Sequence, residues 1–316
     1  MVKIIAGLMG SSVAAGSSRL ASVDQLRTLL QTCKKYNVLE LDTARVYNAG
    51  KSEETLGAIP EAQQQFAIQT KCPGFSPGSL SKEKVTSNCN DSLEALKQSQ
   101  IDIYYFHGPD RKTPLSESCS AINTLYQQDK FRRFGVSNFR ADEVEEIVSI
   151  CKQQGWVLPA VYQGGYNPLL RTGEKALFPT LRRHGISFYA YSPLGGGYFS
   201  RPMSELRQPP SGSRMDEMAV FKNIYVNDDS LRLHDVLTNA VNKHNVTLRE
   251  ATLRWLMHHS ILEADDGVIL GASSAEQMQA NLEASSHGPL PDDLVKVFED
   301  VWEQYNATGK AFGYSV

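Results

Sequence analysis

The sequence predicts a closed α/β barrel of parallel strands, and three observations carry this prediction. Short apolar runs alternate with longer amphipathic segments along the chain, which is typical of βαβ units. Eight such runs occur, as a (β/α)8 TIM barrel requires. The first turn, residues 7–16, lacks the G-x-G-x-x-G spacing that a doubly wound dinucleotide-binding sheet needs. We therefore expect one barrel domain over residues 1–316.

Each expected strand is bounded by polar or turn-forming residues. The eight strands span residues 2–8, 38–43, 66–71, 101–107, 131–137, 160–165, 186–192 and 267–273. Amphipathic segments predict helices at residues 22–36, 81–98, 141–155 and 291–305. Ser81 suits a helix N-terminus, and Gly155 and Gly185 suit helix ends.

Residues 195–227, which follow the seventh expected strand, depart from this pattern. They contain many Pro, Gly and Ser residues, so we expect a long loop after strand seven. Loops of this length inside compact domains are usually functional lids or disordered segments. We expect this one to close over a bound ligand.

The composition is that of an ordinary soluble globular protein, with 41% hydrophobic and 21% charged residues. The net charge of −3 argues against a dedicated nucleic-acid surface, although a local basic pocket could still bind one anionic dinucleotide. The chain has no run of 18 apolar residues, and its N-terminal apolar stretch is too short for a signal peptide. We expect no membrane span and a cytoplasmic location.

The cysteines and histidines predict neither a disulfide framework nor a metal site. The five cysteines are scattered and form no C-x-x-C pair, which indicates reduced thiols. Cys72 follows Lys71 and could lie near an active site, but a small strand residue is the simpler interpretation. The adjacent His258 and His259 do not share a helix face. We therefore expect no metal.

Four residues able to handle a proton occur at or just after the ends of successive strands. Asp42 and Tyr47 follow the second strand, Lys71 ends the third and His107 ends the fourth. Barrel enzymes place their active sites at these carboxyl ends. A free tyrosine has a pKa of about 10, but a nearby ammonium lowers it, and a paired carboxylate keeps that ammonium charged. The set predicts a tyrosine general acid that acts on a carbonyl.

Each of these residues also has a simpler interpretation. Tyr47 could be a surface turn residue, Asp42 a helix cap and His107 a core histidine. Lys71 could form a Schiff base, as lysines of barrel aldolases do. Their occurrence at successive strand ends favours the tyrosine-acid site, because an unpaired charge at a barrel mouth is costly to desolvate.

These residues resemble the catalytic tetrad of the aldo-keto reductases. The resemblance continues in order through GVSNF (135–139), VYQGGYNPL (161–169), AYSPLGGG (190–197) and VILGASSAEQMQANL (268–282). The resemblance covers nearly the whole chain. The motifs FHGPD (106–110) and SPLGGG make it strongest for the aflatoxin-aldehyde-reductase-like branch. The resemblance implies that Tyr47 donates a proton and that His107 orients the substrate carbonyl.

The resemblance also implies a nicotinamide dinucleotide, with NADPH as the expected form. The residues that resemble the nicotinamide site are Ser137, Asn138 and Gln163 for the carboxamide and Tyr191 for stacking on the ring. Those that resemble the pyrophosphate site are Ser192, Leu194, Gly195 and Gly196. Those that resemble the adenosine site are Ser273, Gln277 and Asn281.

One departure from the family concerns the 2′-phosphate of NADPH. Many members carry a lysine or arginine in the strand-eight segment, but GASSAEQMQANL (271–282) has no cation. Arg201, Arg207 and Arg214 in the loop after strand seven could supply the charge-assisted contacts instead.

The expected function is the NADPH-dependent reduction of an aldehyde or ketone. Aromatic walls would favour aromatic or polycyclic substrates, and the candidates are Tyr166, Tyr198, Phe199, Phe312 and Tyr314. The alternative is a cofactor-binding regulatory subunit with little turnover, as channel β-subunits of this fold illustrate. The first strand begins at Val2, so the sequence offers no N-terminal extension to act on a partner. A homo-oligomer remains open.

Overall fold

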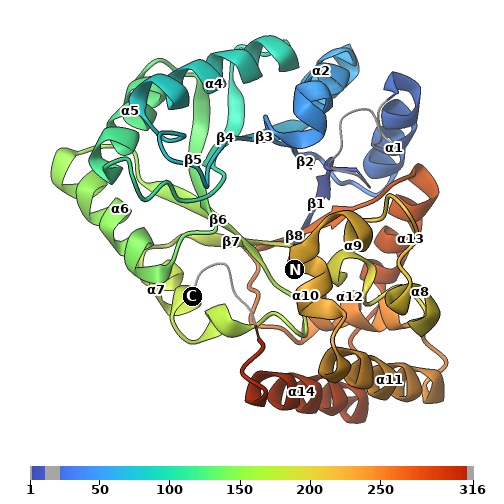
Figure 1. Cartoon of the computed structure of the whole chain (residues 1–316). Helices are drawn as coiled ribbons and strands as arrows, with labels where there is room; N and C mark the ends of the chain where they lie inside the picture. Colours follow the sequence, from blue (N-terminus) through green and yellow to red (C-terminus); the bar gives the residue numbers. More distant parts are fainter. Residues whose placement is uncertain (1, 11–21, 312–316) are drawn as a thin grey trace.

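The computed structural model describes residues 2–10 and 22–311, and its eight parallel strands close into a barrel in sequence order (Figure 1). The strands are β1 (Lys3–Gly7), β2 (Glu40–Asp42), β3 (Ala67–Cys72), β4 (Ile101–Phe106), β5 (Phe131–Ser137), β6 (Pro159–Gly165), β7 (Ser187–Tyr191) and β8 (Gly267–Gly271). The ring is closed because β1 pairs with both β2 and β8. The predicted TIM barrel is confirmed, and each predicted strand end lies within two residues of the observed one.

Helices surround the ring of strands, as Figure 1 shows. The longer ones are α1 (Val23–Lys35), α4 (Lys82–Leu96), α5 (Leu115–Gln127), α6 (Ala141–Gln154), α11 (Asp228–Lys243), α12 (Leu248–His258), α13 (Ala275–Ser286) and α14 (Asp292–Ala307). The shorter ones between β2 and β7 are α2 (Lys51–Gly57), α3 (Pro60–Gln65) and α7 (Leu177–Arg183). Ser81 caps α4 by accepting a hydrogen bond from the Lys84 amide, which stabilises the helix start.

The segment 195–227 is not the plain loop that the sequence predicted. It forms the 3-10 turn η3 (Gly195–Gly197) and three short helices, α8 (Met203–Arg207), α9 (Arg214–Glu217) and α10 (Ala219–Tyr225). The Pro and Gly content indicated a loop, but apolar side chains of the segment are buried and stabilise short helices. Buried residues that hold the segment on the barrel are Leu206, Met215, Phe221, Ile224 and Tyr225.

A small inner core fills the barrel, separate from the larger core between strands and helices. Its buried members are Ile5, Ile103, Tyr105, Val161, Tyr189 and Ile269. The interior of the barrel is thus filled by packed side chains, so an active site has room only at an end of the barrel. None of the helices in the described ranges is long and apolar enough to cross a bilayer.

Candidate active site

The carboxyl ends of three neighbouring strands bring the four predicted proton-handling residues together. Asp42 is the last residue of β2, Lys71 lies one residue before the end of β3, and His107 follows β4. Tyr47 begins the short 3-10 helix η1 (Tyr47–Gly50), which follows β2. Parallel pairing of β2, β3 and β4 fixes the order of these side chains around the mouth.

Lys71 is the centre of the cluster and is completely buried. Its ammonium donates hydrogen bonds to Asp42 Oδ1 (2.7 Å) and to the carbonyl oxygen of Thr43 (2.7 Å), and it lies 3.5 Å from the Tyr47 hydroxyl. Burial lowers the pKa of Lys71, but Asp42 and Tyr47 together raise it by more. The net pKa of Lys71 therefore lies above the usual value. Lys71 is therefore a charged ammonium, which does not suit a Schiff-base nucleophile.

The pKa of Tyr47 differs from the sequence-based expectation. We expected Lys71 to bring it down toward neutrality. Burial of the phenol raises the pKa and outweighs the lowering by Lys71, while Asp42 raises it further. The prediction of a net lowered pKa is wrong for this arrangement, because the sequence does not reveal how deeply the hydroxyl lies. Lys71 still acts in the expected direction by limiting the rise.

His107 faces Tyr47 edge to face, with ring centroids 5.8 Å apart and an interplanar angle of 77°. Burial of the imidazole and the charge of Lys71 lower the pKa of His107 to about 3. The imidazole is therefore neutral at physiological pH and can donate a hydrogen bond without carrying charge.

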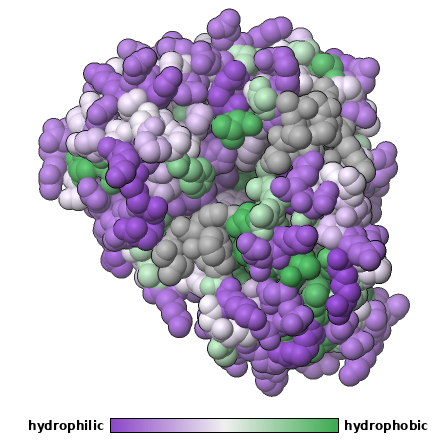
Figure 2. All heavy atoms as spheres, viewed as in Figure 1, coloured by the Kyte–Doolittle hydropathy of each residue, from purple (hydrophilic) through white to green (hydrophobic). Residues whose placement is uncertain are grey.

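A cavity of about 790 Å³ opens beside these residues and runs to the start of α13. Figure 2 shows this face of the molecule as mostly hydrophilic, with a central hollow that has hydrophobic residues around it. The predicted residues that line the cavity are Asp42, Tyr47, His107, Ser137, Asn138, Gln163, Tyr191, Ser192, Leu194, Gly196, Arg201, Arg214, Ser273 and Gln277. Among the predicted catalytic and cofactor-binding residues, those absent from its lining are Lys71, Gly195, Asn281 and the candidate cation Arg207.

Three of the residues expected at the nicotinamide end, Tyr191, Asn138 and Ser137, form one hydrogen-bonded group. Tyr191 donates to Asn138 Oδ1 (2.7 Å), and Asn138 Nδ2 contacts the carbonyl oxygen of His107 (2.9 Å) and Ser137 Oγ (3.0 Å). Gln163 Nε2 donates to Asp42 Oδ1 (2.7 Å). The group is thus joined directly to the tetrad.

Comparison with known proteins decides the family. The profile described as "Aldo/keto reductase family" matches residues 3–303. The chain is 38% identical to an aldo-keto reductase of Pseudocercospora fijiensis, over 87% of this chain and 96% of that protein. It is 37% identical to human aldo-keto reductase family 7 member A3, over 83% and 84% of the two chains. Human aflatoxin B1 aldehyde reductase member 4 is 35% identical, over 84% and 85%.

The chain belongs to the aldo/keto reductase family. The resemblance inferred from the motifs is therefore confirmed, including the similarity to aflatoxin aldehyde reductases. The protein is an NAD(P)H-dependent oxidoreductase, and the family and its reductase-named relatives support carbonyl reduction.

The glycine-rich turn of the reductase has room for a closely bound ligand. Gly195, Gly196 and Gly197 all have positive φ values of 57°, 65° and 112°. A Cβ on Gly196 would lie 2.6 Å from the Phe221 ring. Only glycine fits this backbone, and two of the three residues line the cavity.

At the far end of the cavity, the start of α13 supplies polar groups. Gln277 Oε1 accepts hydrogen bonds from the amide (2.7 Å) and hydroxyl (2.9 Å) of Ser273. Asn281 is fully buried, and its Nδ2 donates to the carbonyl oxygen of Gly271 at 3.3 Å. Its Oδ1 has no hydrogen-bond partner among the described residues.

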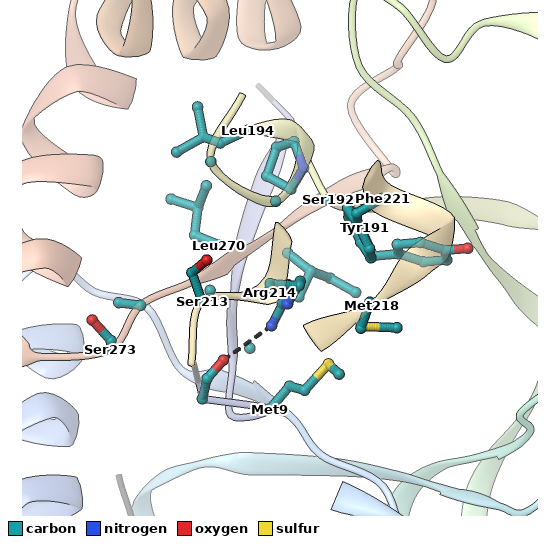
Figure 3. A pocket seen from close by; sticks show the side chains of 18 of the residues that line it. Met9, Tyr191, Ser192, Leu194, Ser213, Arg214, Met218, Phe221, Leu270 and Ser273 are labelled. Atoms are coloured by element: carbon teal, nitrogen blue, oxygen red, sulfur yellow. Dashed lines mark hydrogen bonds between the residues drawn. The ribbon is translucent and has the colours of Figure 1, made fainter. Parts of the chain in front are cut away.

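The three candidate arginines have different surroundings. Arg201 lines the cavity and is paired with Glu205 (2.5 Å). Arg207 is exposed and does not line the cavity. Arg214 donates to the carbonyl oxygen of Gly10 (3.0 Å), and Figure 3 shows its side chain pointing toward the segment after Met9.

Arg214 also belongs to the catalytic end of the cavity. Its guanidinium carbon lies 5.9 Å from the centroid of the Phe221 ring, and its charge lowers the pKa of Tyr47. Burial lowers the pKa of Arg214 itself, and it has no carboxylate partner among residues 2–10 and 22–311.

Sequence reasoning missed Arg249, in the first turn of α12. Arg249 lines the cavity and makes no hydrogen bond or ion pair with the rest of the described chain. Helices α12 and α13 pack side by side, and both begin at the mouth, so Arg249 lies at the same end as Gln277. No local motif marks Arg249, because its position results from helix packing.

The prediction of aromatic walls is wrong for Tyr166, Tyr198 and Phe199. Tyr166, Tyr198 and Phe199 are buried in the outer core and do not line the cavity, while Phe312 and Tyr314 lie outside the described residues. Apolar residues that do line the cavity include Met9, Val46, Phe75, Met218, Val220 and Phe221. Phe75 is 57% exposed and lies 6.0 Å from the His107 ring, so an apolar surface still borders the reacting end.

The five cysteines are free and buried, Cys72 included. Burial raises the pKa of Cys72 to about 12, so its thiol is inert and the simpler reading of this residue is favoured. Within the described ranges, no group of three His, Cys, Asp or Glu side chains is placed to hold a metal ion.

Proposed function

We propose that this protein reduces an aldehyde or ketone with NADPH and that Tyr47 donates the proton. The observation that carries the proposal is the buried Lys71 ammonium, bonded to Asp42 at 2.7 Å and 3.5 Å from the Tyr47 hydroxyl. That hydroxyl borders a cavity large enough for a dinucleotide and a substrate. When bound, NADPH would supply the hydride.

The side chains of the tetrad have separate parts in this reaction. Tyr47 holds the proton that passes to the carbonyl oxygen. Lys71 stabilises the phenolate that remains, and Asp42 keeps the ammonium in place. His107, neutral because its pKa is about 3, donates a hydrogen bond that orients the carbonyl oxygen without competing as an acid.

The residues present fit a nicotinamide dinucleotide along the cavity. We propose that Ser137, Asn138 and Gln163 hold the carboxamide and that Tyr191 stacks on the ring. The amides of the glycine turn would bind the pyrophosphate, since small residues allow close approach. Ser273 and Gln277, which line the cavity, would contact the adenosine.

The choice of NADPH rests on the cations of the cavity. Arg249, which lacks a partner among the described residues, is the best candidate to bind the 2′-phosphate, with Arg201 beside the glycine turn as a second contact. Arg214 joins the segment after β7 to the segment after β1 through Gly10. We propose that this bond closes the short helices over the cofactor.

The proposed substrate is an aromatic or otherwise bulky apolar carbonyl compound. Val46, Phe75 and Met218 give the reacting end of the cavity apolar walls. Such walls would bind apolar groups by burying their surface. We also propose a reducing, cytoplasmic compartment, which suits five free thiols.

The proposal is tested by following NADPH oxidation with a panel of aliphatic and aromatic aldehydes and ketones. We expect turnover that depends on both reactants and a higher kcat/KM for the aromatic members. Absence of turnover above the blank for the whole panel would reject carbonyl reduction. Equal kcat/KM for NADPH and NADH would reject the cofactor preference.

A further inference from the structure

A second tyrosine contacts the Lys71 ammonium from the interior of the barrel. Tyr105 lies on β4, directly opposite Lys71 of β3 in the strand register. The centroid of its ring is 5.7 Å from Lys71 Nζ, and that of Tyr47 is 5.0 Å from the same atom. The ammonium therefore lies close to two tyrosine rings, and of the two only Tyr47 borders the cavity. Tyr105 has no role in the mechanism proposed above.

The ring of Tyr105 is fixed in its position from two sides. Its hydroxyl donates to Gln69 Oε1 (3.0 Å), and Gln69 Nε2 donates to Glu40 Oε2 (2.7 Å). The ring also lies over Gly135 of β5, where a Cβ would be only 2.3 Å from Tyr105 Cδ1. Glycine at 135 thus leaves room for the ring, and the close packing over Gly135 holds the ring in place even without its hydroxyl.

Tyr105 contacts the ammonium without adding a charge. Burial raises the pKa of Tyr105 well above its usual value, and Asp42 raises it further, so the phenol stays protonated. The charged and titratable groups around the pair of Lys71 and Tyr105 are Asp42, Tyr47 and His107 at the mouth and Glu40, Arg133 and Tyr189 below. Asp42 therefore remains the carboxylate that pairs with Lys71.

We propose that Tyr105 is a positioning residue for the reduction, whose neutral ring holds the Lys71 ammonium against Tyr47. The ring face attracts the cation, and the ring volume excludes water from beneath it. Without the ring, the ammonium would move toward the barrel interior and stabilise the Tyr47 phenolate less. This inference rests on the proposed role of Tyr47 as the proton donor.

The test compares Tyr105→Met, which removes the ring and keeps much of the volume, with Tyr105→Phe, which keeps the ring. For Tyr105→Met we expect kcat to fall roughly three- to thirtyfold, the range that corresponds to a buried cation–π contact. The alkaline limb of the kcat profile should move to higher pH, because the pKa of Tyr47 rises. Tyr105→Phe should keep kcat within about threefold of the native value and should not move the alkaline limb of the kcat profile.

Tyr189→Met is the matched control. Tyr189 is another fully buried tyrosine of the inner core, but its hydroxyl contacts Lys3 and Glu40, away from the ammonium. Both Met variants should lose thermal stability, and only Tyr105→Met should shift the pH profile. A shift of equal size in both would show that general loosening of the barrel is the cause and would overturn the proposal.

Gly135→Ala is a second, independent way to move the Tyr105 ring, because the added methyl group would displace that ring. We expect Gly135→Ala to shift the pH profile in the native background and to have no further effect when combined with Tyr105→Met. Additive shifts in the double variant would contradict action through the ring.

A measurement without turnover separates this inference from the proposed function. The ionisation of Tyr47 is followed by ultraviolet difference absorbance, with Tyr47→Phe subtracted as background. Tyr105→Met should raise the midpoint, and Tyr105→Phe should not. An unchanged midpoint in Tyr105→Met would overturn the positioning role, whether or not the native protein reduces any carbonyl in the panel.

Discussion

Gln163 and Lys71 donate hydrogen bonds to the same oxygen, Asp42 Oδ1, each at 2.7 Å. Lys71 lies behind Tyr47, whereas Gln163 borders the cavity where the nicotinamide carboxamide is proposed to bind. The carboxylate therefore joins the cofactor-binding group to the proton-donating group. A substitution at Gln163 should therefore alter proton donation by Tyr47 as well as cofactor binding.

Gln163→Leu tests this connection. Loss of a hydrogen bond to the uncharged carboxamide costs about 0.5–1.5 kcal/mol, so NADPH affinity should fall roughly two- to tenfold. We also expect kcat to fall several-fold, because Asp42 loses one of the hydrogen bonds that hold its carboxylate. Ser137→Ala is the control, since Ser137 does not contact Asp42, and it should weaken cofactor binding alone. An identical kcat for the two variants would contradict the connection.

His107 should make the stability of the protein depend on pH. Its pKa in the folded protein is about 3, because of burial and the charge of Lys71, and the ordinary value is 6.5. Between these values the unfolded chain binds the additional proton, so stability falls as pH is lowered from about 6.5 toward 3. The contribution is on the order of 2–4 kcal/mol, after a reduction for the partial solvent contact of the ring.

Urea unfolding of the native protein and of His107→Asn at several pH values measures this effect. The difference in unfolding free energy between pH 7 and pH 4 should be smaller in His107→Asn. Parallel curves for the two proteins would show that His107 is not held neutral by its surroundings.

Arg249→Ala should change the cofactor preference. We expect its affinity for NADPH to fall about tenfold or more and its affinity for NADH to change little, because only NADPH carries the additional phosphate. Fluorescence titration with both cofactors measures the two dissociation constants. Arg207→Ala, which removes an exposed arginine outside the cavity, is the control. Equal weakening of both cofactors by Arg249→Ala would place the phosphate contact elsewhere, with Arg201 as the next candidate.

The strands and the tetrad could be predicted because their signals are local. Each strand is an apolar run with polar ends, and Asp42, Lys71 and His107 lie where such runs stop. The family motifs then indicated most of the residues that line the cavity. Residues with no local signal, such as Arg249, were missed because helix packing alone brings them to the mouth.

Other errors have the same kind of cause. Tyr198 and Phe199 looked like a substrate wall, but their burial depends on how the segment after β7 folds back onto the barrel. Phe75, which does border the site, lies in a turn with a positive φ of 68° that propensity does not predict. The net pKa of Tyr47 depends on burial, which residue spacing does not reveal.

The central claim is that Tyr47 donates the proton, and Tyr47→Phe tests it most directly. The substitution removes the hydroxyl that lies 3.5 Å from Lys71 Nζ and keeps the ring beside His107. In a single-turnover experiment with NADPH and a reactive aldehyde, we predict a ~10²–10⁴-fold slower reduction with nearly unchanged NADPH affinity. Reduction at close to the native rate would contradict the account, because another group would then protonate the carbonyl oxygen.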